Sequence, residues 1–334
     1  MTKVAVVGCG YWGPNIIRNF NSLDDCRVQA ICDVDDGRLE AMRRRYPGAQ
    51  TLTDYRRVLR DPDIEGIAIC TPVHTHFPLA SEALEAGKHV LVEKPLTHTA
   101  ESSEALVELA EKKGLTLQVD HTFVYTGAVR KIRSIVDSGE IGELLYFDSV
   151  RVNLGVFQTD VNVIWDLATH DVSIMDYVID KRPIWVSAIG SAHYGELENL
   201  AYLTMMFDDS LIAHVHINWL APVKLRSTLI GGSKKMIVYD DLEPSEKLRV
   251  YEKGVTLNGD GTDRSAVLVD YRVGDMFAPY IDRTEPLALV CQTFVDAIRS
   301  GTKPPTDGEA GLRVVRVLEA AQTSVGRNGE QIRI

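Results

Sequence analysis

Three glycines and one aspartate near the start of the chain have the spacing of a dinucleotide-binding turn. The apolar stretch 3–7 runs into Gly8-Cys9-Gly10-Tyr11-Trp12-Gly13, which reads G-x-G-x-x-G, and Asp33 ends a second apolar stretch over 28–32. The first glycine permits a tight turn, the second lets the backbone approach a pyrophosphate, and the third lets helix and strand pack closely. The acid can accept hydrogen bonds from a ribose. We therefore predict a dinucleotide site whose phosphates bind at a helix N-terminus.

A lysine at the end of another apolar run is the second candidate. The run Val90-Leu91-Val92 leads into Glu93-Lys94-Pro95. A continuous apolar run indicates a strand of a parallel sheet that is buried on both faces. Ligands of such sheets bind at the carboxyl ends of the strands. We predict that Lys94 is catalytic, and the alternative is a structural ion pair, for instance with Glu93.

A carboxylate and an imidazole form the third candidate. Asp166 and His170 lie four residues apart in a segment whose pattern predicts a helix at about 165–179. This spacing puts both side chains on one helix face, where the acid could orient the histidine as a general base. The spacing alone also fits a surface ion pair.

Charge and cysteine usage restrict the class of protein. The net charge of −11 at pH 7 argues against a general affinity for nucleic acid or anionic membranes. No apolar run approaches the roughly 20 residues of a membrane span, and the first predicted strand starts too early to leave room for a signal peptide. The five cysteines lack C-x-x-C spacing, and His74 and His76 lack a third metal ligand nearby. We expect a cytoplasmic protein without disulfides or a metal site.

The elements that must position these residues fall into two parts. Residues 1–121 alternate strands and helices, which predicts an α/β doubly wound parallel sheet of the Rossmann type that binds the dinucleotide. Strands predominate over 184–270 with hairpin turns between them, which predicts a large, open, mostly antiparallel mixed sheet. We therefore predict a second domain over 122–334 for substrate binding and oligomerisation, with the final helix able to pack back on the first domain.

These motifs together resemble the glucose–fructose oxidoreductase/inositol 2-dehydrogenase (Gfo/Idh/MocA) family. The matching features cover both parts of the chain in order: Gly8-x-Gly10-x-x-Gly13, Asp33, Thr71-Pro72 followed by His76, Glu93-Lys94-Pro95, and Asp166-x-x-x-His170. The resemblance implies an NAD(P)-dependent oxidoreductase that acts on CH–OH groups. It also implies pairing through the second sheet as a homodimer or homotetramer, and a Lys94–Pro95 bond that is often cis in relatives.

The resemblance also implies roles for single residues. His170 would take the hydroxyl proton, Lys94 would stabilise the same oxygen, and Asp166 would orient the lysine or the substrate. In some relatives the lysine itself transfers the proton, so this division of labour stays open. The residues expected to line the cofactor are Gly8, Gly10, Tyr11, Trp12, Gly13, Asp33, Thr71, Pro72, His76, Glu93 and Lys94.

Different residues bear on the choice of cofactor and on the choice of substrate. Asp33 favours NAD over NADP because a carboxylate repels a 2′-phosphate, and Arg38 is the nearby cation that could serve NADP. The stretch from Arg151 to Asp166 is similar to the branch of the family acting on nucleotide-linked sugars, for example at C3 of a UDP-N-acetylhexosamine or its uronate. The residues expected to bind such a substrate are Arg151, Asn153, Tyr125 and Asn162.

Several alternatives remain open from the sequence. Inositol or a free aldose is the second choice of substrate, and a non-sugar substrate is a third. Arg151 fits a surface ion pair as well as a substrate contact. A dinucleotide-binding regulatory protein without turnover is the alternative from another class, although it would have no need of Lys94, Asp166 and His170 together.

Overall fold

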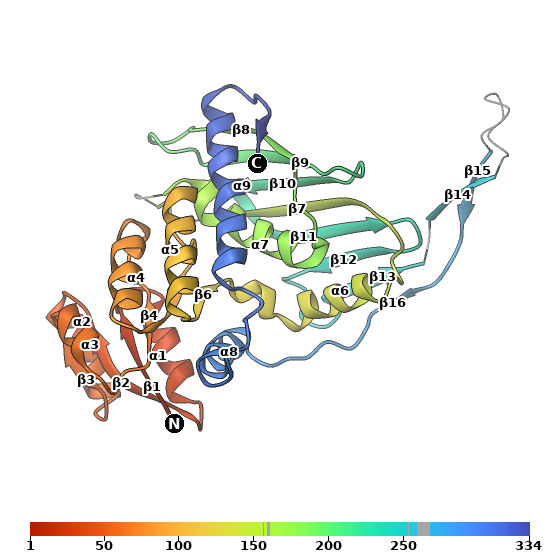
Figure 1. The fold of residues 1–334 in the computed structure, drawn as a ribbon. Helices are drawn as coiled ribbons and strands as arrows, with labels where there is room; N and C mark the ends of the chain where they lie inside the picture. Colours follow the sequence, from red (N-terminus) through yellow and green to blue (C-terminus); the bar gives the residue numbers. More distant parts are fainter. Residues whose placement is uncertain (156, 159–160, 253, 259–267) are drawn as a thin grey trace. The chain divides into compact units, whose positions relative to one another are not determined.

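The computed structural model describes residues 1–155, 157–158, 161–252, 254–258 and 268–334 (Figure 1). The chain divides into two compact units. The first unit contains Met1–Thr126 and Thr284–Glu319, and the second contains Gly127–Arg283 and Ala320–Ile334. This division differs from the boundary proposed from the sequence, because residues 284–319 belong with the N-terminal part.

The first unit is built on a six-stranded sheet with the strand order β3-β2-β1-β4-β5-β6. All of its strand pairs are parallel, and this order is the one found in dinucleotide-binding domains. The strands are β1 (Thr2–Val7), β2 (Cys26–Cys32), β3 (Gln50–Leu52), β4 (Gly66–Ile69), β5 (His89–Glu93) and β6 (Leu117–Asp120). The predicted α/β fold is confirmed. The three-residue strand β3 was not predicted, because an edge strand this short carries no hydrophobic period.

Helices connect these strands and cover the sheet of the first unit. They are α1 (Gly13–Asn21), α2 (Asp36–Arg45), α3 (Tyr55–Arg60), η1 (Val73–Thr75), α4 (His76–Glu85), α5 (Ala100–Lys113), η2 (Thr122–Tyr125), α8 (Pro286–Ser300) and the first part of α9 (Gly308–Gly326). The helix α8 packs against α1, where the rings of Phe20 and Phe294 lie 6.1 Å apart. Both rings are fully buried. Apolar burial therefore explains why this late segment belongs to the first unit.

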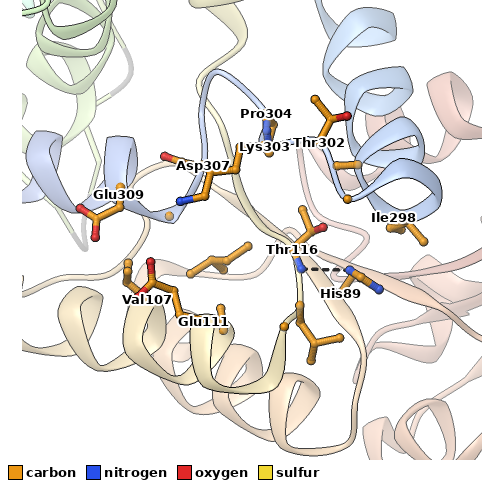
Figure 2. Close-up of a pocket in the computed structure, with 17 residues that line it drawn as sticks. His89, Val107, Glu111, Thr116, Ile298, Thr302, Lys303, Pro304, Asp307 and Glu309 are labelled. Atoms are coloured by element: carbon orange, nitrogen blue, oxygen red, sulfur yellow. Dashed lines mark hydrogen bonds between the residues drawn. The ribbon is translucent and has the colours of Figure 1, made fainter.

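A cavity of about 680 Å³ lies in the first unit between α5 and the loop that joins α8 to α9 (Figure 2). His89, Glu111, Thr116, Lys303 and Asp307 are among the residues that line it. His89 is the first residue of β5, so this cavity lies at the amino end of that strand. Lys94 comes after the opposite end of β5, and the cavity is therefore separate from the predicted site.

The second unit is built on a nine-stranded sheet with the order β16-β13-β12-β11-β7-β10-β9-β8-β17. Its strands pair in antiparallel fashion except for β7 with β10, which confirms the predicted mixed sheet. The strands are β7 (Leu144–Leu154), β8 (Trp185–Ser191), β9 (Leu200–Met206), β10 (Ile212–Asn218), β11 (Leu220–Gly232), β12 (Met236–Asp240), β13 (Leu248–Tyr251), β16 (Met276–Phe277) and β17 (Ile332–Arg333). The strands β14 (Gly254–Asn258) and β15 (Leu268–Arg272) pair in antiparallel fashion in a separate two-stranded sheet.

Helices lie on one face of the nine-stranded sheet (Figure 1). They are α6 (Gly127–Asp137), the π-helix η3 (Ile164–Ala168) and α7 (Thr169–Ile179). The helix α6 packs against α7, and α7 packs on β7.

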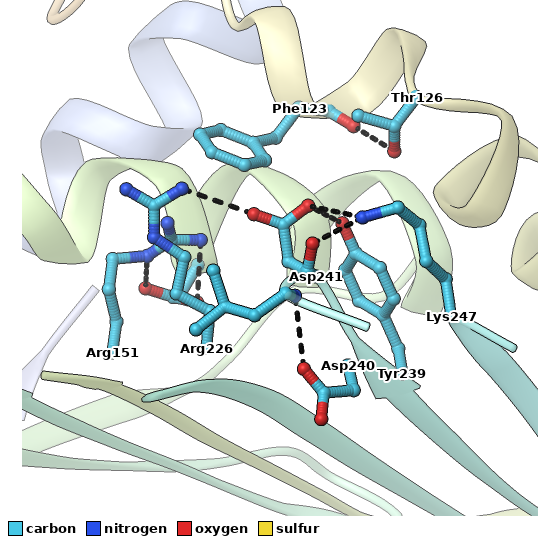
Figure 3. Close-up of polar contacts among 10 residues, drawn as sticks. Phe123, Thr126, Arg151, Arg226, Tyr239, Asp240, Asp241 and Lys247 are labelled. Carbon is cyan, nitrogen blue, oxygen red and sulfur yellow. Dashed lines mark hydrogen bonds and ion pairs between the residues drawn. The ribbon is translucent and has the colours of Figure 1, made fainter. Parts of the chain in front are cut away.

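A buried ion pair fixes α7 to β7. Arg151 (Figure 3) donates from its Nε to Asp171 Oδ2 at 2.7 Å. Ser149 Oγ donates to Asp171 Oδ1 at 2.6 Å. Both charged side chains are only 3% exposed. A buried ion pair adds little net stability, but removing one partner leaves a charge uncompensated in the interior. Arg151 and Asp171 therefore hold the helix that carries His170 in one register on the sheet.

Replacing Asp171 should destabilise the second unit strongly. Asp171→Ala leaves Arg151 buried without its anion, and we expect a loss of about 3–5 kcal/mol in the free energy of unfolding. Asp137→Ala is the matched control, because Asp137 pairs with Arg133 at the surface and its loss should cost less than about 1 kcal/mol. Urea unfolding followed by circular dichroism measures both. Equal losses for the two variants would contradict the role of the buried pair.

Candidate active site

The space around the three glycines of the turn differs from one position to the next. Gly8 has a φ of +96°, and a Cβ there would lie 2.6 Å from the carbonyl oxygen of Cys70. A Cβ on Gly13 would lie 1.9 Å from the carbonyl oxygen of Gly8. A Cβ on Gly10, however, would meet no atom nearer than Arg38 Nη1 at 3.9 Å. The packing of the protein does not require glycine at position 10, and the open space above it suits a ligand that approaches the backbone closely.

The helix α1 begins directly at this turn. Its N-cap residue Trp12 makes no side-chain capping hydrogen bond, and its first turn contains no acidic residue. The partial positive charge of this helix end is therefore not neutralised by the protein itself, as pyrophosphate binding requires.

Asp33 is held rigidly beside the turn. Its Oδ2 accepts a hydrogen bond from the backbone N–H of Cys9 at 2.5 Å, and its Oδ1 accepts one from the backbone N–H of Asp35 at 2.9 Å. Arg38 lies 3.7 Å from Asp33 and 3.6 Å from Asp35. Two carboxylates thus balance the cation that could otherwise attract a 2′-phosphate. The turn, the uncapped helix end and this fixed acid fit a bound NAD.

His76 joins two loops at the carboxyl edge of the sheet. Its Nε2 lies 2.8 Å from the carbonyl oxygen of Thr71, and its Nδ1 lies 2.9 Å from that of Pro95. The ring is 1% exposed, and burial lowers the pKa of the imidazole. From the motif we predicted that His76 lines the cofactor. In the structure both ring nitrogens face protein carbonyls, so His76 braces the loops after β4 and β5 instead.

Lys94 comes directly after β5 and is joined to Pro95 by a cis peptide bond. Its neighbour Glu93 pairs in register with Asp120 at the end of β6. Asp120 Oδ2 accepts a hydrogen bond from Trp12 Nε1, and Asp120 Oδ1 accepts one from Thr122 Oγ1, both at 2.6 Å. A direct hydrogen bond therefore connects the glycine turn to the strand next to Lys94.

Asp120 was not among the predicted site residues. The available signal was its place at the end of the apolar strand 117–120, which neighbours the strand that ends at Glu93. The carboxyl ends of adjacent parallel strands meet at the same edge of a sheet. Strand order had to be known before this signal could be used.

In the second unit the predicted helix over 165–179 begins as the π-helix η3 and continues as α7. Short π-helical turns are frequent at functional sites. Asp166 lies in η3 and accepts a hydrogen bond from Trp219 Nε1 at 3.2 Å, while His170 lies in the first turn of α7 and is half-buried. Asp166 is thus oriented from the sheet side by a tryptophan.

Asn162 has a structural role in place of the predicted substrate contact. Its Oδ1 accepts hydrogen bonds from the N–H groups of Ile164 and Trp165, at 3.1 and 3.2 Å. Its Nδ2 donates to Glu198 and Gln322, at 2.6 and 2.5 Å. The side chain is 5% exposed, and these partners use its hydrogen-bonding capacity. Asn162 therefore holds the start of η3.

Two further predicted substrate residues also make internal contacts. Arg151 forms a buried ion pair with Asp171, so its side chain neither pairs at the surface nor faces solvent. Tyr125 is 3% exposed, and its hydroxyl lies within hydrogen-bonding distance of Gln118 and Thr306, at 3.2 and 3.0 Å. Asn153 is half-buried near the end of β7 and stays a candidate.

The structure thus gathers the predicted residues in two groups. The glycine turn, Asp33, Thr71 and Lys94 lie along the carboxyl edge of the sheet in the first unit. Asp166 and His170 lie together in the second unit. Across the described residues, no group of three or more His, Cys, Asp or Glu side chains could hold a metal ion, and no helix has the length and apolar character to cross a membrane. The five cysteines are free thiols.

The sheet order, the turn and Asp33 define an NAD-binding oxidoreductase. Residues 2–121 match the family model described as "Oxidoreductase family, NAD-binding Rossmann fold", and residues 129–238 match the "GFO/IDH/MocA C-terminal domain". The chain therefore belongs to the Gfo/Idh/MocA family of oxidoreductases, as its motifs suggested.

Two curated proteins and one solved structure are similar to the chain. The chain is 26% identical to Uncharacterized oxidoreductase YrbE of Bacillus subtilis (strain 168), over 97% of this chain and 95% of that protein. It is 34% identical to dTDP-3,4-didehydro-2,6-dideoxy-alpha-D-glucose 3-reductase of Saccharopolyspora spinosa, over 44% of this chain and 45% of that protein. The structure of UDP-N-acetylglucosamine 3-dehydrogenase GnnA from Acidithiobacillus ferrooxidans matches with a TM-score of 0.84 at 21% identity, over 98% of each chain. This last likeness is one of fold.

Removing the acid at the ribose position should weaken the preference for NAD. Asp33→Ser removes the negative charge that repels a 2′-phosphate and releases Arg38, so we expect the ratio of kcat/KM for NAD to that for NADP to fall about tenfold or more. Steady-state kinetics with both cofactors measure this ratio. Asp36→Ser is the control, because Asp36 is exposed and pairs with Arg43 at the surface. An unchanged ratio in Asp33→Ser would remove this residue from cofactor selection.

Proposed function

We propose that this protein transfers hydride between NAD and a hydroxyl or ketone carbon of a sugar-like substrate. The observation that carries the proposal is the position of Lys94, which comes after β5 at the edge of the sheet that also holds the glycine turn. The hydrogen bond from Trp12 to Asp120 connects that turn to the neighbouring strand end. A lysine in this place can serve a group that reacts with the nicotinamide.

Three residues of the chain would share the work of the reaction. Bound NAD supplies the hydride acceptor. Lys94 donates a hydrogen bond to the substrate oxygen and stabilises its developing negative charge. His170 would accept the hydroxyl proton as the carbon loses its hydride, so that a carbonyl remains on the substrate, and Asp166 would orient the reacting groups. The competing assignment, in which Lys94 itself moves the proton, predicts that His170 variants keep a larger share of turnover than Lys94 variants.

A nucleotide-linked sugar is the substrate class that we propose. Two similar proteins are named for such substrates: one is a reductase of a dTDP-linked sugar, and the other, a structural neighbour, is a dehydrogenase of a UDP-linked sugar. Inositol or a free aldose is the second candidate, because the family includes inositol 2-dehydrogenases. A regulatory protein without turnover would need neither Lys94 nor the pair Asp166 and His170.

A substrate panel with one variant tests the reaction. NADH formation should be measured with UDP-N-acetylglucosamine, its uronate, myo-inositol and free glucose. Lys94→Ala should lower kcat by about a hundred- to ten-thousandfold while NADH still binds, as seen by fluorescence. Lys112→Ala, at an exposed lysine on α5, is the control. Near-normal turnover in Lys94→Ala would reject the catalytic role, and no turnover with any sugar or cyclitol would reject the substrate class.

We also propose that a second copy of the chain covers the open face of the nine-stranded sheet. This face exposes apolar and aromatic side chains on β8, β9 and β10, with Ile189 65%, Tyr202 43% and Ile212 42% exposed. The ring of Tyr202 stacks on His216 of the neighbouring strand at 4.5 Å. Such a surface is typical of an interface between copies.

Light scattering at micromolar concentration measures the oligomeric state. We expect a homodimer or homotetramer, and Ile189→Lys should shift it toward monomer because it places a charge within the apolar face. Val273→Lys, at an exposed residue outside the nine strands, is the control and should not change the mass. A monodisperse monomer for the unmodified protein would contradict the proposal.

A further inference from the structure

We propose that Glu93 and Asp120 share one proton at neutral pH, and that the resulting single negative charge positions Lys94 and anchors the glycine turn through Trp12. This inference rests on the proposed function for the catalytic part of Lys94. The shared proton and the anchoring of the turn have readouts that need no turnover.

The register of the sheet brings the two carboxyl groups together. Glu93 ends β5 and Asp120 ends β6, and the two residues are direct neighbours in the parallel pairing. Side chains at paired positions of adjacent strands point to the same face of the sheet, and Asp120 is only 2% exposed, so the two acids lie side by side away from water. An ionised carboxylate can only accept hydrogen bonds and needs donors when it is buried. Glu93 Oε2 is also buried without a hydrogen-bond partner among the described residues, so it lacks the donors that an ionised oxygen would require.

The proton belongs on Glu93. Burial raises the pKa of Glu93 well above its usual range, and the neighbouring charge of Asp120 raises it further. Burial also raises the pKa of Asp120, but hydrogen bonds from Thr122 and Trp12 oppose that rise. Two like charges on neighbouring buried side chains cannot both form without a large free-energy cost, so only one of the two acids ionises near neutral pH.

Lys94, which follows Glu93 in the chain, is the cation whose charge acts on both acids. Lys94 lowers the pKa of both acids. His121 is 1% exposed, and burial together with Lys94 and Arg313 lowers its pKa to about 3, so its ring is neutral. Burial raises the pKa of the Cys70 thiol, which keeps it protonated. The single negative charge of the pair is therefore available as the counter-ion of Lys94.

The same charge reaches the cofactor turn. Trp12 lies between the second and third glycines and donates its indole N–H to Asp120 at 2.6 Å. A hydrogen bond to an ionised acceptor is stronger than one between neutral groups. Asp120 thus serves two partners, the turn that receives the pyrophosphate and the lysine that receives the substrate oxygen. Both acids act through other residues, so they are positioning residues.

Infrared difference spectra between the unmodified full-length protein and each variant, recorded without substrate, test the shared proton. At neutral pH the unmodified protein should show the carbonyl stretch of a protonated carboxylic acid. Glu93→Gln should lose it, because Asp120 stays ionised. Asp120→Asn should retain it, because burial and the lack of donors keep Glu93 protonated. A signal absent from the unmodified protein, or retained in both variants, would overturn the shared proton.

The split between kcat and KM tests the counter-ion. Glu93→Gln keeps the carboxylate of Asp120 beside Lys94, whereas Asp120→Asn removes it. Without its counter-ion the ammonium is no longer held toward the substrate oxygen, so kcat should fall about tenfold or more in Asp120→Asn and much less in Glu93→Gln, while KM for the sugar changes little. Equal losses of kcat in the two variants would overturn the counter-ion role.

The affinity for NAD tests the anchoring of the turn. Trp12→Phe removes the indole N–H and keeps an aromatic ring, so the Kd for NAD should rise about tenfold. Trp185→Phe, on β8 of the second unit, is the control and should leave the Kd unchanged. An unchanged Kd in Trp12→Phe would overturn the anchoring. If the sugar panel fails, this binding experiment and the infrared experiment still decide the inference.

Discussion

The parallel pairing of the first sheet is the constraint on which the site depends. Because all six strands run in the same direction, the segments that leave their carboxyl ends share one edge. The glycine turn comes after β1, Asp33 after β2, Thr71 after β4 and Lys94 after β5, and Asp120 ends β6. Residues that are up to 112 positions apart in the chain, from Gly8 to Asp120, thereby belong to one surface. Strand order therefore determines which side chains can meet at this edge.

Much of this edge could be predicted from the sequence because the signals are local. The three glycines, the acid twenty residues later and the lysine after an apolar run each depend on the conformation of a few neighbouring residues. The alternation of strands and helices was equally clear, since continuous apolar runs mark strands buried on both faces. These features led to the correct fold, cofactor and family.

The roles of the polar residues outside those motifs could not be predicted in the same way. Arg151, Asn162 and Tyr125 have side chains that suit a ligand, yet each is buried against partners far along the chain: Asp171, Gln322 and Thr306. Asp120 is the opposite case, an unremarked acid that strand order places beside Glu93. Long-range pairing decides whether a polar side chain faces a ligand or the interior, and local spacing does not report it.

The π-helical start of the segment that carries Asp166 and His170 has a consequence for comparing relatives. A π turn takes up one residue more than an α-helical turn, because its hydrogen bonds span five residues instead of four. Deleting a single residue within 164–168 would turn it into ordinary α-helix, in which four residues make about the rotation that five make here, so the helix after it would keep its direction. A homologue with a one-residue gap here would then present its histidine in the same direction, even if the spacing of its motif letters differed.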